Sequence, residues 1–152
     1  GSEGQKCYSM VALTSAVAKV SMGYVPTDSG MGCYALVAAD YQRICIPLET
    51  VASGEFVECV VDGIVKGVSV GASGKVASTA MSTFTKGDLV FITATGTYAA
   101  EISTWTNECW THQTTNTGTT HQNAAGIALS SGETATFDLW LLEKSYSRTA
   151  AT

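Results

Sequence analysis

The residues best suited to chemistry lie together in one Thr-rich stretch of the sequence. Cys109 and His112 are separated by two residues, a spacing that fits two zinc ligands, and His121 offers a third. No second Cys and no carboxylate cluster lies near them in the sequence. Cys109 and His112 also resemble a nucleophile and its base, but such a pair needs a rigid scaffold, which a Thr-rich loop does not indicate. We therefore predict no metal site and no catalytic residue here.

Other catalytic patterns are missing as well. The 13 carboxylates form no recognisable acid–base constellation. The run Gly71-x-x-Gly74-Lys75 lacks the Walker spacing, and no Ser stands in a Gly-x-Ser-x-Gly elbow. We predict a protein that is not an enzyme and that uses no cofactor.

Trp105 and Trp110 are the more informative residues of the same stretch. A large aromatic side chain in a polar segment is costly unless it packs against something. The two indoles suit a protein–protein anchor, a platform on which sugar rings stack, or simple packing at the end of a barrel. The sequence leaves these three alternatives open, and we take both as candidate partner-binding residues.

The five cysteines, Cys7, Cys33, Cys45, Cys59 and Cys109, are odd in number and include no CxxC. Three of them lie in apolar, strand-like runs, where Cys behaves as a small hydrophobic residue. We predict reduced thiols in a protein made in a cytoplasm. The alternative is a secreted protein with two disulfides and one spare Cys.

Composition and charge exclude two classes of partner. The chain has 152 residues, which suits one domain, with a net charge of −5 and a pI near 4.8. Its eight basic residues form no run, although phosphate neutralisation requires clustered Lys and Arg, so we predict no nucleic-acid partner. No segment approaches the roughly 18 apolar residues that span a bilayer, so we predict no membrane association.

Short apolar runs between turn signals predict an all-β fold. Pro47 indicates a strand end or an edge position, and Asp62-Gly63 is typical of a type I′ hairpin turn that would pair its two flanking strands. The result is a single-domain β-barrel or β-sandwich of about ten short strands. The expected strands include 33–38, 43–48, 55–61, 64–70, 89–93, 97–102, 124–129 and 134–143.

The first residues predict a different organisation. Residues 1–10 begin polar and Gly-rich, so we expect a flexible arm there, followed by one β domain over 11–152 with a polar insertion at 103–122. Lys6, Tyr8 and Met10 place a cation, an aromatic ring and a soft apolar group in that arm. These residues suit an anchor on a partner's exposed strand edge. The competing interpretation makes Cys7 to Leu13 the first strand of the barrel.

Several short sequence motifs in the second half of the chain occur in the same order as in one known family. They are Lys86-Gly87-Asp88-Leu89-Val90-Phe91, Thr95-Gly96-Thr97-Tyr98 and Ala125-Gly126-Ile127-Ala128-Leu129, followed by a Gly-Glu turn and an alternating final strand. This pattern resembles the small capsid decoration, or cement, proteins of tailed bacteriophages. The resemblance covers residues 42–143, while the 103–122 insertion and the five cysteines depart from it.

The resemblance implies a non-catalytic structural protein. Such proteins are β-rich, bind the major capsid protein on the outer surface of the capsid, commonly as homotrimers, and stabilise the shell. It implies a location on the virion after synthesis in the host cytoplasm. The alternative is a carbohydrate- or receptor-binding β-sandwich domain of a virion or secreted protein.

Overall fold

Nine β-strands carry the fold in a computed structural model that describes residues 4–35, 43–69, 85–92, 110–113, 124–130 and 136–143. The predicted all-β class is confirmed, and within these ranges no helix is long and apolar enough to cross a membrane. The strands are β1 (Gln5–Ala12), β2 (Met22–Thr27), β3 (Gly30–Ala35), β4 (Arg43–Pro47), β5 (Phe56–Ser69), β6 (Leu89–Ile92), β7 (Trp110–Gln113), β8 (Gly126–Ala128) and β9 (Thr136–Leu141).

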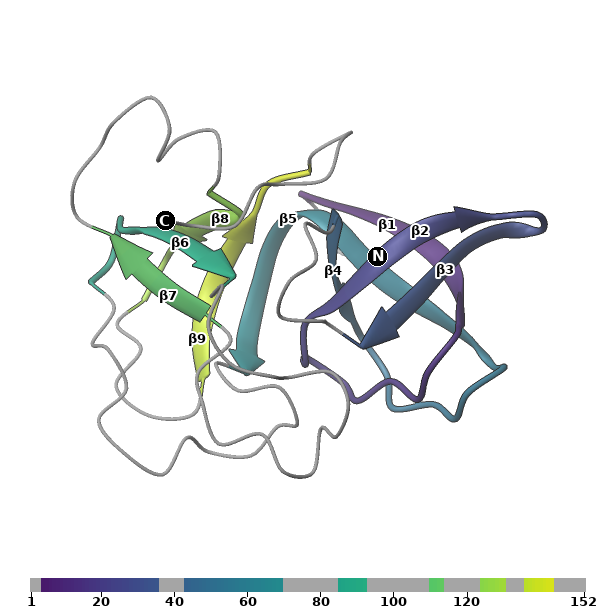
Figure 1. The fold of residues 1–152 in the computed structure, drawn as a ribbon. Coiled ribbons are helices and arrows are strands. Elements are labelled where there is room, and N and C mark those ends of the chain that lie inside the picture. The colour runs from purple at the N-terminus through teal and green to yellow at the C-terminus, as the bar shows by residue number, and fades with distance from the viewer. Residues whose placement is uncertain are drawn as a thin grey trace.

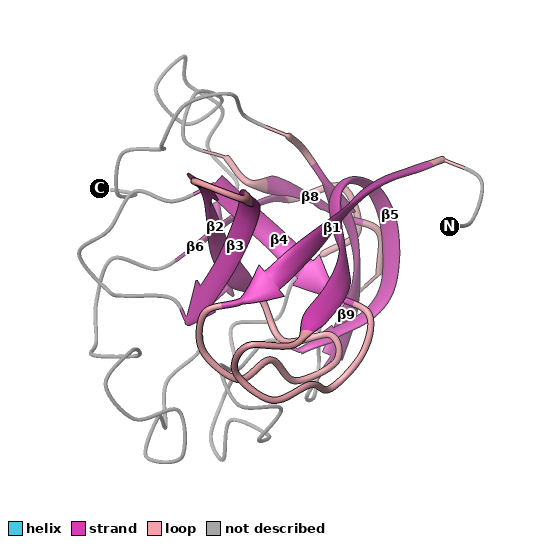
Figure 2. Ribbon diagram, turned by 90° about the vertical axis from the view of Figure 1, so that its right-hand side faces the viewer, coloured by secondary structure: helices cyan, strands magenta, loops and turns pink. Residues whose placement is uncertain are grey.

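The first five strands close into a barrel. Their order is β1-β3-β2-β4-β5, and β1 pairs with β5 to complete the ring. The β1–β3 pair is parallel and the other four pairs are antiparallel. Figure 2 shows these strands arranged around a common interior. Closure leaves β1, at the start of the described chain, paired on both of its edges.

The remaining strands extend the sheet from the second half of β5. The order continues β5-β9-β8-β6-β7, with every pairing antiparallel. In Figure 1 these strands lie on the opposite side of β5 from the barrel. The long strand β5 therefore belongs to both halves of the molecule.

The predicted Asp62-Gly63 hairpin is wrong, because the chain passes through these residues as one continuous strand. Residues 56–63 pair with β1, and residues 63–69 pair with β9, so the two halves of β5 do not pair with each other. The dipeptide does mark an irregularity. Lys6 pairs with Asp62 while Cys7 pairs with Val60, which leaves one extra residue in β5 as a β-bulge.

Gly63 has a positive φ of 110°, which disfavours any residue with a Cβ. A Cβ at this position would also overlap the carbonyl oxygen of Gly4, which crosses directly over it. The positive φ that a hairpin turn would need is thus present at Gly63. Here it produces a bend in β5 and allows the close approach of the Gly4 backbone.

Two hydrophobic cores lie on opposite faces of β4 and β5. Cys45 points into the barrel, and its neighbours Ile44 and Ile46 point out of it, as alternation along a strand requires. The barrel core also contains Met10, Ala12, Ala16, Met22, Tyr24, Cys33, Val57, Cys59 and Val61. The second core also contains Val60, Val65, Val68, Val90, Trp110, Ala125, Ala128, Phe137, Leu139 and Leu141.

Three further predictions from the sequence concern the N-terminal arm, the strand at 97–102 and the insertion at 103–122. Residues 5–10 form most of β1, so they are an ordered strand rather than part of a flexible arm. The predicted strand at 97–102 lies outside the described residues. Within the 103–122 insertion, Trp110–Gln113 forms β7 and pairs with β6, and the remainder lies outside the described residues.

We predict that Gly63→Ala lowers the free energy of unfolding by about 2–4 kcal/mol. The loss combines the strain of a positive φ with displacement of the Gly4 carbonyl. Chemical denaturation followed by circular dichroism measures it.

Gly67→Ala is the matched control in the same strand. Gly67 also has a positive φ, of 70°, but a Cβ there meets nothing within 4 Å. We expect a cost of about 1–2 kcal/mol from the backbone alone. Equal losses for the two variants would contradict the role given to the Gly4 contact.

Candidate binding surface

Lys6 and Tyr8, two of the predicted partner-binding residues, stand next to each other on β1. The Lys6 ammonium lies 5.4 Å from the centre of the Tyr8 ring, within the range of a cation–π contact. Lys6 is exposed, and Tyr8 is half-buried with part of its ring against the barrel core. Their place in a paired strand gives them a fixed position on the surface.

Glu143, just after β9, holds Lys6 in place. Lys6 Nζ donates a hydrogen bond of 2.7 Å to Glu143 Oε1, and this bond is the main reason that the pKa of Lys6 lies above its ordinary value. The backbone N–H of Glu143 donates to Asp62 Oδ2 at 2.9 Å. These contacts tie the ends of β1 and β9 to the bend in β5.

Met10 and Trp110 are fully buried, which differs from the prediction that they bind a partner. Met10 points into the barrel, where alternation places it with Ala12. Trp110 lies in the second core. A partner or a sugar cannot reach either side chain in this fold, so we do not carry the binding prediction forward for them. Trp105 lies outside the described residues.

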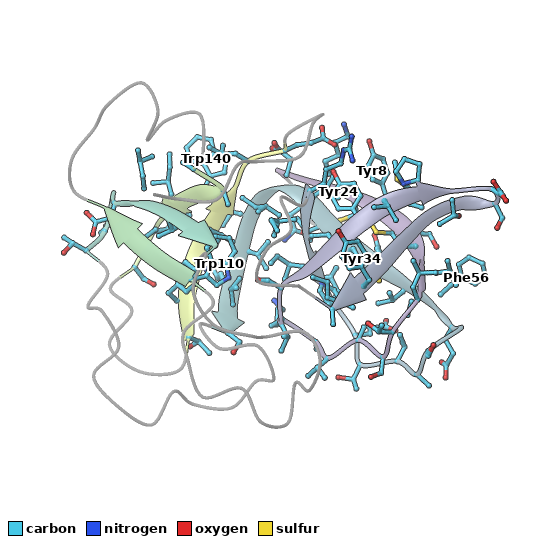
Figure 3. All side chains as sticks on the ribbon, in the orientation of Figure 1. Tyr8, Tyr24, Tyr34, Phe56, Trp110 and Trp140 are labelled. Carbon is cyan, nitrogen blue, oxygen red and sulfur yellow. The ribbon has the colours of Figure 1, made fainter. Side chains whose placement is uncertain are left out.

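The indole of Trp110 joins the two halves of the molecule. Its Nε1–H donates a buried hydrogen bond of 2.8 Å to the hydroxyl of Ser21, directly before β2. Its ring packs edge-on against Phe137, with 5.7 Å between the ring centres. The indole is thus a packing residue, although it packs in the second core and not at the end of the barrel as the sequence alternative had it (Figure 3).

The four cysteines that the structure describes are free thiols. Cys33, Cys45 and Cys59 are buried together in the barrel, and Cys7 is half-buried. A hydrogen bond with Cys59 and burial both raise the pKa of the Cys33 thiol. The contact with Cys33 lowers the pKa of Cys59, but its contact with Cys45 and its burial raise it further, so the net shift is upward. Protonated, enclosed thiols are unreactive.

Of the candidate metal-ligating and nucleophilic residues, the structure describes only one. Cys109 and His121 lie outside the described residues, and His112 falls in β7. Across the part of the chain that is described, no three His, Cys, Asp or Glu side chains are grouped closely enough to hold a metal ion.

Sequence reasoning missed the exposed apolar side chains. The large hydrophobic residues with the most exposed surface in the described ranges are Leu13, Phe56, Ile64 and Trp140. The signal for Trp140 was present, because Phe137, Leu139 and Leu141 alternate with it and face the core. Trp140, rather than Trp110, is the tryptophan that the described surface presents.

No protein-family model matches the sequence, and no curated protein sequence matches it. A solved structure does. The fold is similar to that of the head fiber gp8.5 N base of bacteriophage phi29. The TM-score is 0.51 with 10% sequence identity, and the match covers 93% of this chain and 99% of the other. At that identity the likeness concerns the fold, and it extends over almost the whole of both chains.

We predict that a thiol reagent leaves Cys33, Cys45 and Cys59 unmodified in the native protein. Burial of all three side chains excludes the reagent, and the raised pKa values of Cys33 and Cys59 keep those two thiols protonated, whereas half-buried Cys7 reacts sooner. Titration in denaturant without reductant should then release five thiols, with peptide mass mapping to assign each. A count of one would support the alternative with two disulfides.

We predict that Ser21→Ala lowers the free energy of unfolding by about 1–3 kcal/mol, because it leaves the buried indole N–H without its acceptor. Trp110→Phe completes a double-mutant cycle measured by chemical denaturation. If the two losses simply add, the hydrogen bond between the halves contributes nothing.

Proposed function

We propose that this protein is a non-catalytic structural component of a bacteriophage virion, which binds the outer surface of the capsid and stabilises the shell. The observation that carries the proposal is the fold shared with a phage head fiber base over nearly the full length of both chains. The sequence pattern over residues 42–143 points independently to the capsid decoration proteins. Both likenesses support a structural role on a phage head.

The physical character of the chain suits that role. A nine-stranded sheet with two cores supplies a rigid body, and the thiols inside the barrel are protected from reagents in the surroundings. The chain is acidic overall and contains few charged residues. Binding to a pre-formed protein shell requires such a fixed surface rather than an active site.

We propose the major capsid protein as the partner and a homotrimer as the bound form. Symmetric closure is a common way for identical chains to cover exposed apolar surface. On β1, Lys6 and Tyr8 form a fixed polar and aromatic feature suited to the rim of such a contact.

The proposal predicts that the purified protein sediments with empty, expanded capsid shells built from the major capsid protein encoded by the same genome. The Lys6→Ala/Tyr8→Ala double variant should bind about tenfold or more weakly, since it removes a charge and an aromatic contact. Decorated shells should also withstand heating better than bare shells. Co-sedimentation and shell melting curves measure the two effects.

Lys86→Ala, an exposed lysine in the turn before β6, is the control for loss of a positive charge. It should bind shells as the natural sequence does. Failure of the natural sequence to bind shells, with the fold intact by circular dichroism, would refute the capsid proposal.

A further inference from the structure

Lys19, in the connection between β1 and β2, has an unusual backbone conformation. Its φ of 66° lies in the left-handed region, and among the described residues it alone combines a side chain with a positive φ. Such a conformation is strained, and it persists only where the surrounding contacts fix it. Strained residues are concentrated at sites that a protein uses, so the contacts of Lys19 indicate what its strain is for.

Three hydrogen bonds hold Lys19, and they reach two different parts of the molecule. Its N–H donates to the carbonyl oxygen of Pro47, at the end of β4, at 2.8 Å. Its carbonyl oxygen accepts from the Ser69 N–H at 2.8 Å, and its Nζ donates to the Lys66 carbonyl oxygen at 2.9 Å. Pro47 belongs to the barrel, whereas Lys66 and Ser69 belong to the last part of β5. We call Lys19 with these three bonds the clasp.

The clasp lies at the open end of an arch that β5 forms. In Figure 1 the first part of β5 rises along the barrel, and the last part, residues 64–69, descends beside β9. The bend at Gly63 lies between the two parts. Ser69 ends the strand, six residues beyond Gly63. The clasp therefore joins the end of the arch to the barrel, away from the bend.

The described chain crosses from the barrel to the other half once, at the bend. The strands before Asp62 belong to the barrel, and those after Gly63 belong to the other half. Gln5 Nε2 donates to the Ile64 carbonyl oxygen beside this crossing, where the chain itself already holds the two halves together. At the clasp no such covalent link is near, so non-covalent contacts alone keep the halves joined there.

The two halves differ in what they lose if they separate. The barrel is a closed ring, and the residues of its core all precede the bend. The second core is shared, because Ile44, Ile46 and Val60 of the barrel complete it. Separation therefore leaves the barrel core intact. It removes the cover of the second core and breaks the hydrogen bond by which Trp110 reaches the barrel.

We propose that the molecule consists of two cooperative units that meet at Gly63, and that the clasp sets how rarely the second unit opens. The half after the bend opens and loses its structure as one unit while the barrel stays folded. The left-handed backbone of Lys19 directs its N–H to the barrel and its carbonyl oxygen to the end of β5, so one residue bonds both units. The device is independent of the capsid proposal.

Hydrogen exchange of the whole chain under native conditions, followed by peptide mass spectrometry, tests the boundary between the units. After correction for intrinsic rates, the amides of β8 and β9 should exchange at least tenfold faster than those of β1 and β3, because the barrel stays closed when the other half opens. Equal exchange in the two halves, or faster exchange in the barrel, would overturn the proposal.

Lys19→Met tests the clasp, since it removes the ammonium group and keeps a side chain of similar length. Exchange in β8 and β9 should become about fivefold or more faster, because a charged donor no longer bonds the Lys66 carbonyl oxygen, and exchange in β1 and β3 should not change. Lys19→Arg keeps a cationic donor and should exchange as the natural sequence does. No change in Lys19→Met, or equal acceleration in both halves, would contradict the role of Lys19.

Lys66→Met is the matched control. It removes an exposed lysine beside the clasp but leaves the backbone carbonyl oxygen to which Lys19 donates. Exchange should be unchanged in both halves, and an effect as large as that of Lys19→Met would assign the change to lost charge and refute the clasp. If Lys19→Met loses its fold by circular dichroism, Lys19→Ala replaces it, and the comparison of the two halves in the natural sequence still decides the boundary.

Discussion

A single strand, β5, forms backbone hydrogen bonds in both halves of the molecule, and the bend at Gly63 makes this possible. On a regular strand Val61 and Val65 would share a face, because they are four residues apart. Here Val61 lies in the barrel core and Val65 in the second core. The bulge opposite Lys6 and the positive φ at Gly63 turn the strand between them. A side chain at residue 63 would collide with Gly4, so only glycine permits the bend and the closure by β1 together.

Because β5 belongs to both halves of the molecule, it determines how the remaining strands pack. The barrel encloses three thiols, and the outer faces of β4 and β5 need a cover, which the sheet of β9, β8, β6 and β7 supplies. Trp110 reaches across this second core to Ser21, so a polar bond as well as apolar contact joins the two halves. The inward residues of both sheets are thereby fixed. The residues between them must point outward, which is why Phe56 and Trp140 are exposed.

The sequence predicts where strands lie better than it predicts how they pair. The range 43–48 and the observed Arg43–Pro47 agree closely, because apolar residues between turn signals carry local information. The pairing of β5 depends on β1 and β9, which are distant in sequence, and these ladders outcompete the hairpin that Asp62-Gly63 favours locally. The same dependence on distant strands explains why two residues that the sequence predicted to bind a partner are buried. Met10 and Trp110 are apolar residues in polar surroundings, which is typical of an anchor, but distant strands enclose them.

The strand β5 also sets the angle between the two halves of the molecule. Phe56 and Ile64, one exposed residue from each half, both belong to β5 and lie on either side of the bulge and the bend. Both halves of β5 are paired on either side or backed by a core, so the strand cannot flex independently of the body. The bend at Gly63 then sets the angle between the two halves. The bend that allows one strand to serve two cores is thus also the element that determines how the outer faces of the two halves are oriented relative to each other.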